Sequence, residues 1–172
     1  MMQKQALNAD VQGELFRSAL IASITPKECK DVVDGFCKDK MFGIVYDIAR
    51  FSKSQEVKEY AAKALIGNSE TPQWCIAQLI IWLYENHEMK LVGEAALQVA
   101  DDWAACLAVN RIAVSGALSL EGVGGIRETL EAIEKEAKSG AARKLAGELL
   151  GNWLSEEEKT MVRGIMERYA QA

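Results

Sequence analysis

Apolar residues recur along most of the chain at the spacing of an amphipathic helix. In the segment that starts at Val123 they fall at Ile126, Leu130, Ile133 and Ala137, spaced by four, three and four residues, which places them in one stripe. No segment shows the sustained alternation of apolar and polar residues that is typical of a strand. The pattern therefore predicts an all-α protein.

Capping residues mark where the helices begin and end. Thr25-Pro26 and Thr71-Pro72 each join a good N-cap to a proline that suits the first helical position, and Glu28 completes a capping box with Thr25. Other starts are expected at Ser54, Asn86, Asp102 and Ser155, and stops at Gly67-Asn68, Gly116 and Gly151-Asn152. Together these signals predict about ten helices: 4–22, 26–38, 40–52, 55–67, 72–85, 87–100, 103–116, 123–138, 141–153 and 156–171.

Short links between helices favour antiparallel neighbours. The expected architecture is a single domain over 1–172, either a compact stack of helix pairs or a short irregular α-solenoid. The segment from Trp74 to Tyr84 is apolar nearly all round, which predicts the central helix of the core and places Trp74 and Trp82 inside it.

Three alanine-rich segments are similar to one another: VKEYAAKALIGN from Val57, LVGEAALQVADD from Leu91 and AARKLAGELLGN from Ala141. They resemble the second helix of a HEAT-type repeat, whose small residues let paired helices approach closely. The resemblance covers about 36 of the 172 residues, at spacings of 34 and 84, and the third segment exchanges even for odd helix order. It implies stacked helix pairs, and an irregular α-helical domain is the alternative.

The stretch LEGVGGI resembles the turn of a helix-hairpin-helix module, with Leu120, Gly122 and Gly124 at the turn positions. That family holds a nucleic-acid phosphate on backbone N–H groups, so 118–133 is an alternative nucleic-acid-binding site. Glu128 and Glu131 stand where the family has alanine and an apolar residue. We therefore favour a plain helix-helix turn and expect a positive φ at the second or third glycine.

Charge and hydropathy narrow the classes of partner. Twenty Lys and Arg are scattered among 25 Asp and Glu, for a net charge of −5, which disfavours a nucleic-acid partner. There is no secretory h-region, and the longest nearly apolar run is too short for a membrane span, so we predict a cytoplasmic protein.

The residues that carry chemistry do not form a recognised site. The four cysteines have no CxxC spacing and one histidine to join them, which favours reduced thiols over zinc. His87 lacks the second histidine of HExxH, and Asp101-Asp102 is better placed to cap a helix at Asp102 than to act as an acid/base pair. We predict a non-enzyme without cofactor or metal; an all-α enzyme with Cys/His or carboxylate chemistry is the alternative.

Two tryptophans remain as candidate partner-binding residues. Trp103 and Trp153 lie near the ends of their predicted helices, and tryptophan is enriched at interaction hot spots. The leading hypothesis is a protein-protein interaction module, such as an adaptor, a small chaperone or an assembly subunit, with a protein partner. Homo-oligomerisation stays open.

Overall fold

The computed structural model of the protein describes residues 18–118 and 124–152. A short helical segment at 18–22 precedes eight labelled helices. These are α2 (Pro26–Lys38), α3 (Phe42–Phe51), α4 (Gln55–Gly67), α5 (Gln73–Glu85), α6 (Met89–Gln98), α7 (Asp102–Leu118), α8 (Gly124–Glu136) and α9 (Gly140–Gly151). No strand occurs within these ranges, so the predicted all-α class is confirmed. The predicted helix at 156–171, and the one at 4–22 except its last turn, fall outside them.

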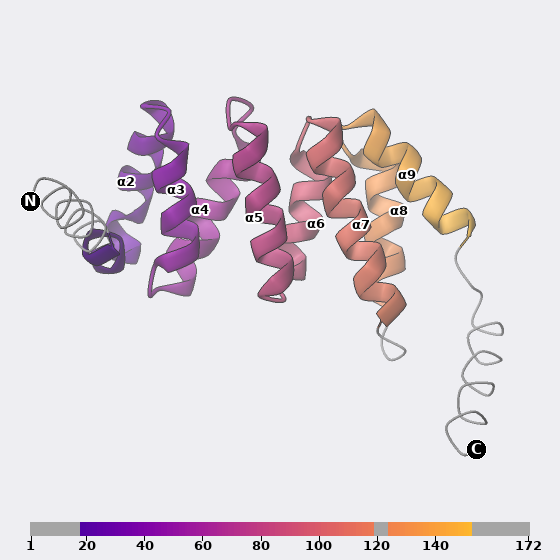
Figure 1. The fold of residues 1–172 in the computed structure, drawn as a ribbon, viewed down its shortest axis with the longest axis horizontal. Helices are drawn as coiled ribbons and strands as arrows, with labels where there is room; N and C mark the ends of the chain where they lie inside the picture. Colours follow the sequence, from indigo (N-terminus) through magenta and orange to yellow (C-terminus); the bar gives the residue numbers. More distant parts are fainter. Residues whose placement is uncertain (1–17, 119–123, 153–172) are drawn as a thin grey trace, which may run out of the picture.

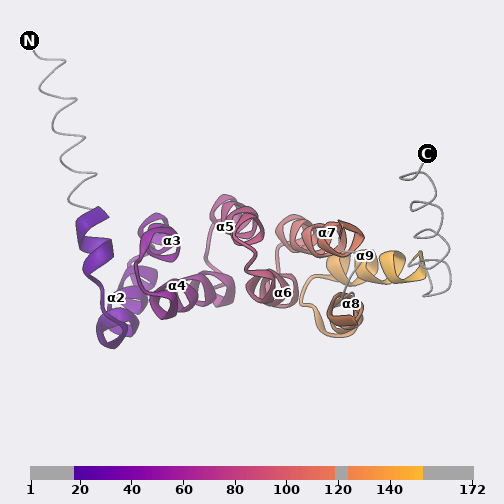
Figure 2. The ribbon, with the colours of Figure 1, turned by 90° about the horizontal axis from the view of Figure 1, so that it is seen from below.

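The helices form an elongated array of two layers (Figure 1). Figure 2 shows α3, α5 and α7 in one row and α2, α4, α6 and α8 in the other. Each helix from α2 to α7 packs against the next helix and the next but one, and α9 packs against α7 and α8. Helices in the same layer therefore run parallel, while consecutive helices run antiparallel.

The core fills the space between the layers. Its largest fully buried side chains include Ile48, Leu65, Leu79 and Ile112. Fully buried alanines lie between them, one each on α4, α6, α7 and α9: Ala61, Ala95, Ala108 and Ala146. Because alanine keeps only a methyl group, it lets neighbouring helix backbones approach closely, as the alanine-rich segments predict.

Three joints between consecutive helices have the same construction. At α3–α4, α6–α7 and α8–α9, three residues link the helices, and the third residue caps the second helix. The caps are Ser54, Asp101 and Ser139, whose side-chain oxygens accept the backbone N–H three residues later at 3.5, 2.8 and 3.0 Å. In each joint the residue after the first helix also donates its N–H to that helix. Three tightly packed hairpins result.

Several boundary signals are confirmed. The Thr25 N–H and hydroxyl both donate to Glu28 Oε2, at 3.2 and 2.6 Å, and hold the predicted capping box. These bonds to its ionised form lower the pKa of the Glu28 carboxyl. The expected stops hold at Gly67-Asn68 and at Gly151-Asn152, since α4 and α9 end on these glycines.

Other boundary predictions were wrong by one or more residues. Thr71 does not cap α5, because its hydroxyl donates instead to the Leu65 carbonyl at 2.9 Å, and Pro72 is the N-cap. Asp102 is not the cap of α7 but its first residue, because Asp101 takes the capping role. Asn86 ends α5 rather than starting α6, and α7 continues past Gly116 to Leu118.

In the part of the chain that the structure describes, left-handed backbone occurs at two residues other than glycine. Lys40 (φ 59°) and His87 (φ 61°) directly follow the C-caps of α2 and α5. In both places the next residue's N–H reaches back to the helix, Met41 to the Phe36 carbonyl and Glu88 to the Leu83 carbonyl, each at 2.8 Å. This is the Schellman bond pattern, which normally favours glycine. A positive φ was expected at Gly124 or Gly125; Gly125 does not have one, since it lies in the first turn of α8.

The three alanine-rich segments lie in α4, α6 and α9. The helices α4 and α6 pack together in one layer, whereas α9 packs against α7 of the other layer. The resemblance of these segments to HEAT-type helices therefore stays a prediction.

Candidate interaction site

The outward side of α5 carries an exposed tryptophan. Trp74, Gln78, Ile81 and Glu85 are spaced by four, three and four residues and so form one stripe. Trp74 is 54% exposed, Gln78 and Glu85 are exposed, and Ile81 is half-buried. The opposite side of α5 holds the fully buried Leu79, so the helix has a clear inside and outside.

The outward side of α7 repeats this arrangement. Trp103, Leu107, Asn110 and Val114 have the same spacing, and Trp103 is 57% exposed. Asn110 and Val114 are exposed and Leu107 is half-buried. Trp103 is the second residue of α7, as Trp74 is the second residue of α5.

A hydrogen bond ties together the ends of α5 and α7 that carry these tryptophans. Gln73 Nε2, at the start of α5, donates to Asp101 Oδ1, at the cap of α7, at 3.1 Å. The helices α5 and α7 are neighbours in one layer (Figures 1 and 2), and the bond between their starts shows that they run in the same direction. We call this surface the tryptophan face and define it by Trp74, Gln78, Ile81, Trp103, Leu107 and Asn110.

The start of α3 borders the tryptophan face on one side. The Cys75 thiol donates to the Phe42 carbonyl at 3.8 Å and so holds the first turns of α3 and α5 together. A Cβ at Gly43 would lie 4.0 Å from Trp74 Cη2, which places the indole of Trp74 beside the first turn of α3.

Negative charge lies at the edge of the tryptophan face where the helices start. Asp101 and Asp102 are both exposed. Asp101 Oδ1 accepts from Ala104 N–H and from Gln73, while Asp102 Oδ1 accepts the hydroxyl of the buried Ser139 at 2.6 Å. Within the described ranges neither carboxylate forms an ion pair, so both keep their charge available at this edge.

Positive charge lies toward the other end of the same helices. The Arg111 guanidinium of α7 stacks over the Tyr84 ring of α5, 5.1 Å from its centroid. On α3, Arg50 stacks over Tyr46 and over the exposed Phe51, at 5.2 and 4.8 Å. The Nε atoms of both arginines are buried without a hydrogen-bond partner. The outer surface of this layer is thus acidic where α5 and α7 start, and mixed in charge toward the other end, where Glu85 is also exposed.

The predictions for the four tryptophans differ in how they agree with the structure. Trp103 is exposed on the tryptophan face, and Trp153 lies outside the described residues. The placement of Trp74 in the core was wrong, whereas Trp82 is half-buried against the core, with Lys58 Nζ 5.9 Å from its ring centroid. The exposure of Trp74 could have been predicted from Gln78. This residue is the one polar residue in an apolar run, and it lies on the same helical stripe as Trp74.

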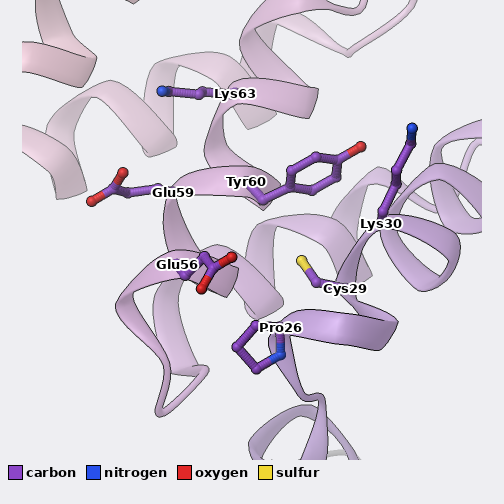
Figure 3. A pocket seen from close by; sticks show the side chains of 7 residues that line it. All are labelled: Pro26, Cys29, Lys30, Glu56, Glu59, Tyr60 and Lys63. Atoms are coloured by element: carbon purple, nitrogen blue, oxygen red, sulfur yellow. The ribbon is translucent and has the colours of Figure 1, made fainter.

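A shallow groove of about 340 Å³ lies on the other layer, between α2 and α4 (Figure 3). Its charged lining is mixed, with Lys30 and Lys63 opposed by Glu56 and Glu59. Tyr60, which also lines it, donates its hydroxyl to Asp34 at 2.9 Å. Oppositely charged side chains that stand together in this way favour a solvated surface over selective capture of one ion.

The cysteine thiols are poorly suited to nucleophilic catalysis. Burial raises the pKa of Cys29 in that groove, and it raises the pKa of Cys75 to about 11. Thiolate is the reactive form, so a raised pKa suppresses reactivity at neutral pH. His87 is exposed at a helix joint. Within the described ranges no three His, Cys, Asp or Glu side chains gather to hold a metal ion.

The described structure offers little support for the nucleic-acid-binding site that the sequence suggested as an alternative. Arg127, in the segment proposed for nucleic acid, pairs with Glu131 at 3.0 Å, which offsets its charge. Residues 119–123 of that segment lie outside the described ranges. No described helix is long and apolar enough to cross a membrane.

Comparison with known proteins identifies no relative: no family model, no curated protein and no solved structure matches the chain.

Proposed function

We propose that the protein is a non-enzymatic interaction module that binds a protein partner on the tryptophan face. The observation that supports this most directly is the pair of exposed indoles, Trp74 and Trp103, at the same position of two adjacent parallel helices. Exposure of a tryptophan side chain to water is energetically unfavourable, and its burial against a partner removes a large apolar area from water.

The polar residues of the tryptophan face also suit a partner. Gln78 is exposed one turn after Trp74 on α5, and Asn110 is exposed two turns after Trp103 on α7. A side-chain amide carries both donors and an acceptor, so it can pair with a partner's backbone N–H and C=O. Apolar anchors accompanied by amide groups are typical of protein interfaces, in which aromatic residues dominate the energy.

Site-specific photocrosslinking tests the proposal. A photoreactive phenylalanine replaces Gln78 in one protein and Lys90, exposed on α6 of the other layer, in a second protein that serves as control. Both are incubated with extract of the source cells, and the crosslinked proteins are identified by mass spectrometry. We expect one partner to crosslink from position 78 and not from position 90.

The same experiment is repeated with Trp103→Ala. If Trp103 anchors the partner, the yield of crosslink from position 78 should fall by about tenfold or more, as expected for a hot-spot residue. A partner that crosslinks equally from both positions, or whose yield does not depend on Trp103, would contradict the proposal. A cytoplasmic location stays a prediction from the sequence.

A further inference from the structure

We infer that the partner segment on the tryptophan face presents an arginine side chain, which lies against the indole of Trp103 and pairs with the Asp101 carboxylate. This inference rests on the proposed function and names the chemistry of the partner. It follows from the position of the exposed Trp103 indole at the helix start where Asp101 and Asp102 are exposed and, within the described ranges, form no ion pair.

The indoles favour a cation. A guanidinium or ammonium placed over an aromatic face is attracted by the ring quadrupole, and tryptophan is the strongest such ring. The protein already uses this contact, since Arg50 stacks on Tyr46 and Phe51 and Arg111 stacks on Tyr84. No described cation lies over Trp74 or Trp103, which leaves both rings available to a partner.

The carboxylates also favour a positively charged group on the partner. Asp101 bonds to Gln73 of α5 and caps α7, so its charge lies between the helix ends that carry the two indoles. Gln73 and the Ala104 N–H both donate to Oδ1 of Asp101, which leaves Oδ2 for a donor from outside. Arginine fits better than lysine, because its planar guanidinium can stack on a ring and donate to a carboxylate at the same time.

The opposite end of the face sets a limit on the partner. Arg111 lies between α5 and α7 in the second half of these helices, where it would repel a second basic residue. Because Arg111 and the exposed Glu85 make that end mixed in charge, the acidic edge fits one basic side chain better than a polybasic segment that covers the whole face. Lys138 and Asp101 line a neighbouring hollow of about 210 Å³, so Lys138 weakens the local negative potential.

Peptide titration tests the inference. Three short, capped peptides of serine, glycine and alanine differ only in a central arginine, glutamine or glutamate. Each is titrated at low salt into the full-length protein, while the indole N–H signals of Trp74 and Trp103 are followed by NMR and assigned with Trp→Phe variants. We expect the arginine peptide to shift the Trp103 signal more than the Trp74 signal and to bind about tenfold more tightly than the glutamine peptide, with the glutamate peptide weaker still.

Matched variants locate the contact. Asp101→Asn removes the charge but keeps a good N-cap, and it should weaken the arginine peptide about fivefold without affecting the glutamine peptide. Lys138→Gln should strengthen the arginine peptide. Glu85→Gln, which removes an exposed carboxylate at the far end of α5, should have no effect on either peptide. Circular dichroism confirms that each variant is folded.

Several results would overturn the inference. Equal binding of the arginine and glutamine peptides, preference for glutamate, no shift of either indole, or an Asp101→Asn variant that binds arginine normally would each exclude an arginine-specific site. Self-association that Trp103→Ala abolishes would show that a second copy covers the face. The crosslinking experiment separates the two proposals. If the peptide titrations fail but a partner still crosslinks from position 78 in a manner that depends on Trp103, the interaction module stands and only the arginine chemistry fails. If no partner crosslinks from position 78 either, both proposals fail.

Discussion

The two layers of the array have similar interiors and different outer surfaces. Facing the core, both layers present fully buried aliphatic side chains, such as Leu65 on α4 and Leu79 on α5. Facing outward, α4, α6 and α8 carry charged residues that pair with each other, such as Lys63 with Glu94, whereas α5 and α7 carry Trp74 and Trp103. Core packing requires nothing of these outward positions, and this difference is the basis on which we propose that the partner binds to one surface.

The first prediction contrasts the inside and the outside of one helix. Leu79→Ala on α5 should lower the free energy of unfolding by about 2–5 kcal/mol, because it leaves a cavity in the core between the layers. Trp74→Ala on the same helix should lower it by less than about 1 kcal/mol. Urea denaturation followed by circular dichroism at a helical wavelength measures both. A loss at Trp74 as large as that at Leu79 would show that the indole is structural and would remove the main support for the tryptophan face.

The second prediction concerns the joint next to the tryptophan face. Ser139→Ala should lower the free energy of unfolding by about 1–2 kcal/mol, because it removes the cap of α9 and the buried hydroxyl donor to Asp102. Ser54→Ala is the matched control at the α3–α4 joint, where the capping distance is 3.5 Å and the hydroxyl is half-buried. We expect Ser54→Ala to cost about half as much. Equal losses would mean that the bond to Asp102 adds nothing.

The fold follows closely from the sequence, because apolar periodicity and caps are local signals. The range 55–67 matches α4 residue for residue, since Ser54 and Gly67-Asn68 both act locally. Errors arose where two neighbours competed for one role: Asp101 took the cap from Asp102, and Thr71 bonded backward to Leu65. No local pattern reveals such tertiary choices.

The site was only half predictable. Trp103 lies near the start of its predicted helix, which made it a candidate partner-binding residue, and it is exposed. Trp74 lies in a helix that is apolar nearly all round, and which side faces outward is decided by the layer in which α5 packs. The relation between Asp101 and Gln73 joins two helices and therefore required the structure.

The third prediction uses the thiol that holds α3 against α5. Burial, aided by the negative charge of Asp47, raises the pKa of Cys75 to about 11, above the ordinary value of 9.0 that applies when the chain is unfolded. Below pH 9 the thiol is protonated in both states and contributes no pH dependence. Between pH 9 and about 11 the unfolded chain releases the proton and the folded chain does not, so stability falls as pH rises.

Urea denaturation at several pH values across this window measures the effect. Cys75→Ala is the control, because it keeps the tyrosine and lysine titrations that both proteins share. The wild type should lose more stability than Cys75→Ala between pH 9 and 11. Parallel pH profiles for the two proteins would mean that water reaches the thiol and that the α3–α5 contact is looser than described.

The smallest effect is expected on the charged layer. Lys63 Nζ and Glu94 Oε1 are 3.7 Å apart and bridge α4 and α6 at the surface. Exposed ion pairs contribute about 0–1 kcal/mol, because water screens the charges and both side chains lose freedom. We expect Lys63→Gln, Glu94→Gln and the double variant to change the free energy of unfolding by less than about 0.5 kcal/mol each, with a coupling energy of similar size in the double-mutant cycle.

The same variants should leave the crosslink from position 78 unchanged, since they lie on the opposite layer. If they abolish that crosslink while the protein stays folded, the partner contacts the charged layer, and the contrast between the two surfaces does not mark the binding side.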